Sequence, residues 1–149
     1  MTIKETLYQG CEAFVNERLN SIQERIHNIQ ESLMSETKSS AGDKHETGRA
    51  MLQLEREKAG AQLAEVQKLK QILEKVNLGT SSDRVGLGSL VLTSQANYFI
   101  AISAGQLQVE QTIYYAISAQ APIGRLLMGK CVGDSIQFNG NRIDILSID

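Results

Sequence analysis

The sequence has few cysteines and histidines, the residues of disulfide frameworks and zinc sites, and it lacks the long apolar runs of membrane spans. Its cysteines and histidines are spaced neither as a disulfide framework nor as zinc ligands: Cys11, Cys131, His27 and His45. No run of about 18 apolar residues occurs, and residues 1–14 contain no apolar segment of a secretory signal. We therefore expect a cytoplasmic protein with no metal or cofactor of its own and no membrane partner.

An excess of positive charge is also missing. The 15 Lys and Arg residues are scattered among 17 Asp and Glu residues, and the net charge is −2. Proteins that bind duplex DNA on their own usually carry a basic patch. We expect no direct binding to duplex DNA, so that any role in a nucleic-acid process would depend on a protein partner.

Residues 1–77 contain no proline and no alternation typical of strands. Apolar residues recur there at spacings of three and four, which is typical of helices packed along one narrow stripe. The first row is Tyr8, Cys11, Val15, Leu19, Ile22, Ile26, Ile29 and Leu33, and the second is Leu52, Ala59, Leu63, Val66, Leu69, Leu73 and Val76. A polar segment at about 35–49 separates the rows, so we expect an antiparallel coiled-coil hairpin over 1–77 with a tip loop there. A parallel coiled-coil dimer is the alternative to this monomeric hairpin.

After a short linker at 78–84, residues 85–149 show a strand pattern. β-Branched and aromatic residues predict strands at 89–94, 97–103 and 111–118, and Asn139-Gly140 predicts a hairpin of 135–138 with 142–148. Pro122 and Gly129 bracket a short helix. The fold class is therefore α+β: a helical hairpin followed by a small antiparallel sheet domain with one short helix.

Two carboxylates stand near the expected start of the second helix. Asp43 and Glu46 have the spacing of a capping box, and Ser40 with Asp43 offers the same box one turn earlier. Residues three apart on a helical turn also share a face, so the two oxygens could complete the coordination of a Mg²⁺ ion held largely by a partner. The residues alone leave both interpretations open.

Signatures of catalysis by the chain itself are missing. Gly86-x-Gly88 lacks the third glycine and the strand–helix setting of a dinucleotide fingerprint, and it is typical of a turn entering a strand. No nucleophile elbow, Walker loop or kinase signature occurs.

Three stretches resemble the Gre family (GreA/GreB type) of bacterial transcript-cleavage factors. "ISAQAPIGRLLMGKCVGDSI" (117–136) is similar to the family's most recognisable segment, and "VGLGSLV" (85–91) to its entry into the first strand. "AGDKHETGRA" (41–50) resembles the tip of the family's coiled coil, with Asp43 and Glu46 on its two acidic positions. The order of a helical hairpin and a β-rich domain also agrees.

The resemblance implies a C-terminal domain of FKBP-like fold that docks on the rim of the RNA polymerase secondary channel. Ser118, Gln120 and Pro122 fall in the docking loop. The coiled coil would enter the channel, where Asp43 and Glu46 would act as the catalytic carboxylates and share the polymerase's Mg²⁺. The protein would then be an accessory factor rather than an enzyme: it would stimulate cleavage of backtracked RNA, contacting the RNA 3′ end only indirectly, and so promote elongation.

The tip departs from the family's usual Leu-Ser-Glu-Asn-Ala-Glu-Tyr. Here the residues after Asp43 are Lys44-His45-Glu46-Thr47-Gly48-Arg49-Ala50, and Gln120 stands where some members have an acid. An alternative is therefore a secondary-channel regulator that does not promote cleavage. A third hypothesis is an FKBP-like prolyl isomerase or chaperone, against which the lack of tryptophan counts.

Overall fold

The computed structural model describes the backbone of residues 1–38 and 42–149, and the side chains of residues 1–36 and 46–149. Contacts divide the chain into two compact units. We call Val15–Lys70 the hairpin unit, and Met1–Phe14 together with Gln71–Asp149 the sheet unit. The beginning of the first long helix and the end of the second thus belong to the same unit as the sheet.

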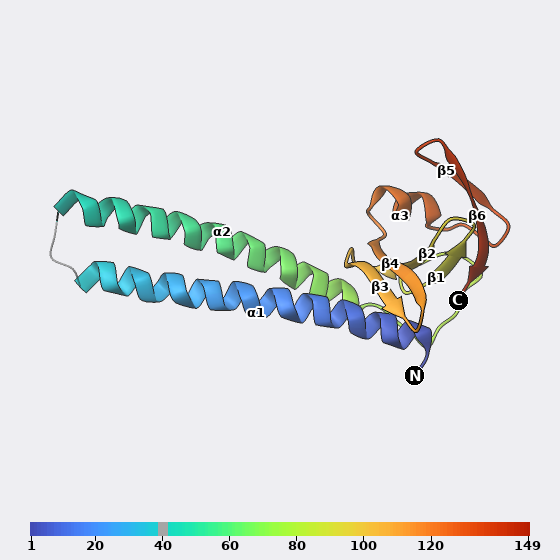
Figure 1. Cartoon of the computed structure of the whole chain (residues 1–149), viewed down its shortest axis with the longest axis horizontal. Helices are drawn as coiled ribbons and strands as arrows, with labels where there is room; N and C mark the ends of the chain where they lie inside the picture. The colour runs from blue at the N-terminus through green and yellow to red at the C-terminus, as the bar shows by residue number, and fades with distance from the viewer. Residues whose placement is uncertain (39–41) are drawn as a thin grey trace. The chain divides into compact units, whose positions relative to one another are not determined.

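Two long helices, α1 (Ile3–Lys38) and α2 (Gly42–Glu74), run side by side (Figure 1). A capping box begins α1: the Thr2 hydroxyl accepts a hydrogen bond from the Glu5 amide at 3.1 Å, and the Glu5 carboxylate accepts one from the Thr2 amide at 3.3 Å. In the hairpin unit the two apolar rows meet as predicted. Ile26, Ile29 and Ala59 form the buried cluster, and Ile22, Leu33, Leu52 and Leu63 pack against it.

The helices extend further into the polar segment than the sequence indicated. Residues 35–38 and 42–49, expected in the tip loop, are helical. The prediction of a loop rests on the Ser, Thr, Gly and Lys residues of this segment, but Ser, Thr and Lys cost little in a helix and a single Gly costs only about 1 kcal/mol. Packing against a neighbouring helix outweighs such small preferences.

The sheet unit contains a six-stranded sheet of order β3-β4-β2-β1-β6-β5. The strands are β1 (Leu90–Thr93), β2 (Asn97–Ala101), β3 (Gly105–Val109), β4 (Thr112–Ser118), β5 (Ser135–Phe138) and β6 (Asn141–Ile148). The predicted α+β class is confirmed, but β3 was not predicted and the sheet is not wholly antiparallel. Because β3 forms a hairpin with β4, β4 lies parallel to β2, with Tyr98 opposite Tyr115.

Side chains fill both faces of this sheet. The short helix α3 (Pro122–Leu127) covers one face, over a cluster of Val85, Val91, Ile100, Ile123, Leu127, Ile136, Ile143 and Ile145. Phe99 alternates to the opposite face and is also fully buried. The first turns of α1 belong to this unit: Leu107 of β3 lies against Gly10, and Cys11 is fully buried. Burial raises the pKa of the Cys11 thiol to about 11.

The predicted β5–β6 hairpin has the expected turn. Asn139 and Gly140 join the strands, with φ angles of 52° and 79°, as a type I′ turn requires. The predicted short helix is α3, with Pro122 in its first turn. Gly129 follows in the left-handed region at φ 79°.

Candidate functional site

The residues of the expected docking loop form a compact turn between β4 and α3, which we call the 118–124 turn. The Ser118 hydroxyl accepts a hydrogen bond from the Gln120 amide at 3.0 Å, and the Ser118 carbonyl accepts one from the Ala121 amide at 3.1 Å. The Ser118 amide itself donates to the Ser103 hydroxyl at 3.1 Å. Gln120 and Pro122 are exposed. The turn therefore presents these two side chains on a backbone held by hydrogen bonds.

Gly124 closes the 118–124 turn. A Cβ atom at this position would lie 2.1 Å from the Ser118 carbonyl oxygen, far inside van der Waals contact. The backbone of α3 can thus approach the end of β4 only because residue 124 has no side chain. The sequence identified Gly124 only as part of the Gre-like motif, and no local pattern indicates its close approach to Ser118.

The two predicted tip carboxylates both fall at the start of α2. Glu46 is exposed there. The side chains of Asp43 and Ser40 lie outside the described residues, so the distance between the two carboxylates and the predicted Ser40 cap stay predictions.

Close to Glu46, two residues that sequence reasoning missed connect the helices. The Arg49 guanidinium donates a hydrogen bond to the Leu33 carbonyl at 3.4 Å. On α1, the Glu36 carboxylate lies beside Gly48, 3.6 Å from where a Cβ would stand. The second turn of α2 is therefore held against α1 at the position where Glu46 projects.

In the parts of the chain whose side chains are described, no three His, Cys, Asp or Glu residues come together as metal ligands. Mg²⁺ needs near-octahedral oxygen coordination. The side chain of Asp43 lies outside the described residues, so a metal shared between Asp43, Glu46 and a partner stays a prediction.

Comparisons with known proteins leave the family open. No family model matches the chain, and no curated protein matches it. Among solved structures, "Structure of the transcription factor Gfh1" is similar over 93% of this chain and 92% of that chain, at 22% identity and a TM-score of 0.36. A similarity of this strength assigns no function by itself. Within the described residues, no helix is long and apolar enough to cross a membrane.

Gly48 offers a direct test of the packing near Glu46. Replacing Gly48 with alanine should stabilise the protein by about 0.5–1 kcal/mol, because a helical glycine costs that much and the new methyl group meets Glu36 only at ordinary contact distance. Urea denaturation measures the change. Gly10→Ala is the matched control: its methyl group would lie 3.2 Å from Leu107, so we expect no gain. A destabilised Gly48→Ala variant would contradict this packing.

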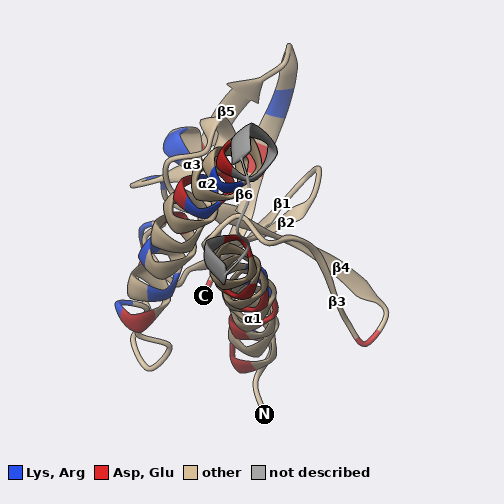
Figure 2. Ribbon diagram, turned by 90° about the vertical axis from the view of Figure 1, so that its left-hand side faces the viewer, with Lys and Arg blue, Asp and Glu red and all other residues tan. Residues whose placement is uncertain are grey.

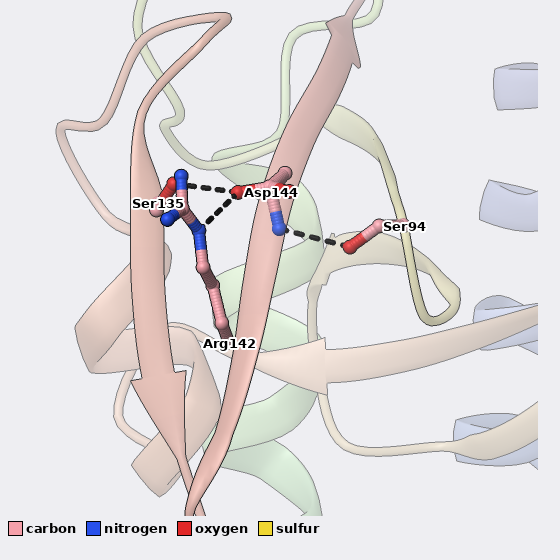
Figure 3. Close-up of polar contacts among 4 residues, drawn as sticks. All are labelled: Ser94, Ser135, Arg142 and Asp144. Atoms are coloured by element: carbon pink, nitrogen blue, oxygen red, sulfur yellow. Dashed lines mark hydrogen bonds and ion pairs between the residues drawn. The ribbon is translucent and has the colours of Figure 1, made fainter.

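A second polar cluster lies on the β5–β6 hairpin (Figure 3). One Asp144 carboxylate oxygen accepts hydrogen bonds from the Ser135 hydroxyl at 2.6 Å and from the Arg142 side chain at 3.0 Å. The Asp144 amide donates to the Ser94 hydroxyl at 2.9 Å, which ties the hairpin to the β1–β2 turn. The bonds from Ser135 and Arg142 lower the pKa of Asp144. Each group is engaged with the others, so we assign the cluster a structural role.

This cluster predicts an acid-dependent loss of stability. A carboxyl whose pKa is lowered by folding stabilises the protein fully above its ordinary pKa of 3.8, and the contribution disappears as pH falls through the lower folded value. The stability difference between the wild type and Asp144→Asn should therefore shrink as pH falls from about 5 toward 2. When Ser135 is also replaced by alanine, the difference between Asp144 and Asp144→Asn should be smaller, because the bond from Ser135 is the largest cause of the lowered pKa of Asp144. Urea midpoints at each pH measure it, and a constant difference would disprove the linkage.

Proposed function

We propose that this protein is a Gre-type transcription factor, a cytoplasmic monomer that binds bacterial RNA polymerase at the rim of the secondary channel. Its C-terminal domain would dock there and the end of its helical hairpin would enter the channel. The chain would act as an accessory factor that stimulates the polymerase's own cleavage of backtracked RNA.

The 118–124 turn is the observation that carries this proposal. Its Gre-like residues have defined physical roles: Ser118 caps the turn, Pro122 opens α3 and Gly124 permits the close approach. The turn leaves Gln120 and Pro122 exposed. Because a hydrogen-bonded turn loses little freedom on binding, it suits docking on a rigid partner surface.

At the start of α2, Asp43 and Glu46 would complete the coordination of the partner's Mg²⁺. In such a site the metal ion activates water and stabilises the charge that develops during phosphodiester cleavage. This chain would contribute two carboxylates on a helical turn. The bond from Arg49 to Leu33 and the Glu36–Gly48 contact would fix the position of that turn against α1.

The residues around Glu46 support one alternative. Lys44, His45, Thr47 and Gly48 differ from the family's usual tip, and they change the charge and shape beside the two acids. A protein with this tip could occupy the channel and slow transcription without promoting cleavage. Both versions require the same docking surface.

Docking is tested first. Fluorescently labelled full-length protein should bind bacterial core RNA polymerase in an anisotropy titration, and Gln120→Arg should weaken binding about tenfold, as expected for an exposed residue inside an interface. Gln106→Arg makes the same change on exposed β3 and should bind normally. If the wild type does not bind, both versions of the proposal fail. If the two variants bind equally well, the docking surface is wrongly assigned.

A further inference from the structure

The hairpin unit has a groove of about 500 Å³ along one side, between α1 and α2. Arg18, Ile22 and Arg25 line it from α1, and Glu65, Val66 and Leu69 line it from α2. On each helix the lining residues follow a spacing of three, four and seven, so they form one face of about two helical turns. The groove therefore runs along the two helices for about 10 Å, and a third helix could pack along it in the same direction.

The floor and walls of the groove differ in chemistry. Ile22 and Leu69 are half-buried, and Val66 is only 4% exposed, so the floor is apolar. The α1 wall presents Arg18 and Arg25, one heptad apart and both exposed. On the other wall, the Glu65 carboxylate lies 3.3 Å from the Lys68 ammonium, which offsets its charge. Outside the groove, the charged residues of α1 are mostly acidic, whereas those of α2 are of both signs (Figure 2).

We propose that this groove binds an amphipathic α-helix of a partner protein. The helix would place its apolar stripe on Ile22, Val66 and Leu69 and two carboxylates, seven residues apart, opposite Arg18 and Arg25. Seven residues span about 10 Å on any α-helix, so the two pairs can form together. This inference does not depend on the proposed function.

The same arginines could attract a nucleic acid, but the rest of the groove does not suit one. Sequence-tolerant binding of single strands uses aromatic side chains on which bases stack. None of the residues that line the groove is aromatic, and Glu65 stands on the wall opposite the arginines. An apolar floor between charged edges is instead the surface that coiled-coil helices bury.

The probe is a synthetic peptide of about 21 residues, three heptads with leucine at a and d and glutamate at e and g. The control peptide has lysine at e and g. Like charges discourage each peptide from pairing with itself. In an anisotropy titration with the full chain, the glutamate peptide should bind at least about tenfold more tightly than the lysine peptide. Its affinity should fall as salt is raised, because exposed charge pairs are screened.

Two charge-reversed variants decide the site. Arg18→Glu with Arg25→Glu should reverse the preference, so that the lysine peptide binds more tightly than the glutamate peptide. Lys58→Glu with Lys70→Glu makes the same change in net charge on exposed positions of α2 outside the groove and should keep the wild-type preference. Circular dichroism checks that both variants are folded.

No binding of either peptide, or an equal response of the two variants, would overturn the proposal. Binding of a single-stranded RNA in place of the peptides, lost in the Arg18 and Arg25 variant, would also overturn it and assign the groove to nucleic acid.

Discussion

Replacing Gly124 with alanine should destabilise the protein by about 3 kcal/mol, a large part of the stability of a typical domain. The new Cβ atom would stand 2.1 Å from the Ser118 carbonyl oxygen. The backbone fixes the positions of both atoms, so no side-chain rotation can relieve the clash. Either α3 moves off the end of β4, or the turn opens and loses its hydrogen bonds. The midpoint of urea denaturation measures the loss of stability.

Two other glycines serve as matched controls for Gly124. Gly86 has nothing within 4 Å of its Cβ position and no positive φ, so Gly86→Ala should be neutral within about 0.5 kcal/mol. Gly129 also has open space but a φ of +79°, so its alanine variant should lose about 1 kcal/mol from backbone strain alone. Equal effects at Gly86 and Gly124 would contradict the close approach of α3 to Ser118.

Replacing either tip carboxylate should remove cleavage stimulation while leaving polymerase binding intact. If Asp43 and Glu46 each supply a ligand to the shared Mg²⁺, Asp43→Ala and Glu46→Gln should each lower the rate of RNA cleavage in backtracked complexes about 100-fold. The Gln variant preserves the shape of Glu46 and changes its charge, so it separates ligation from packing. The measurement is a time course of transcript shortening with saturating protein.

Glu55→Ala is the control for the tip variants, because it removes an exposed carboxylate further along α2. It should cleave at the wild-type rate. If the wild type binds polymerase but stimulates no cleavage, the obstructing regulator is the correct version of the proposal. If the wild type stimulates cleavage and both tip variants match it, the carboxylates are wrongly assigned.

The two long helices and the β5–β6 hairpin were predictable because their signals are local. The rows that contain Ile26 and Ala59 repeat over many turns, and a long repeat leaves no alternative to a helix packed along one stripe. Asn139-Gly140 specifies a two-residue turn by its φ angles alone. Strand β3 has only Leu107 and Val109 as apolar residues, and pairing with β4 supplies what its own sequence lacks.

The parts of the site that escaped prediction depend on contacts between distant residues. The bond from Arg49 to Leu33 follows from the relative register of α1 and α2, which apolar rows define only approximately. The approach of Gly124 to Ser118 is a steric relation between backbone atoms, and composition carries no trace of it. The roles of Asp43 and Glu46 depend on a partner, so the chain alone leaves them a prediction.

The rate at which a thiol reagent labels the buried Cys11 measures how often the first turns of α1 separate from the rest of the sheet unit. Burial raises the pKa of the Cys11 thiol to about 11, so the reactive thiolate is scarce at neutral pH, and the side chain is fully buried in the sheet unit. A thiol reagent can modify it only during the moments when the first turns of α1 separate from their neighbours. Cys131 is partly exposed in the same unit. The ratio of the two labelling rates therefore reports how often this end of α1 leaves the folded state.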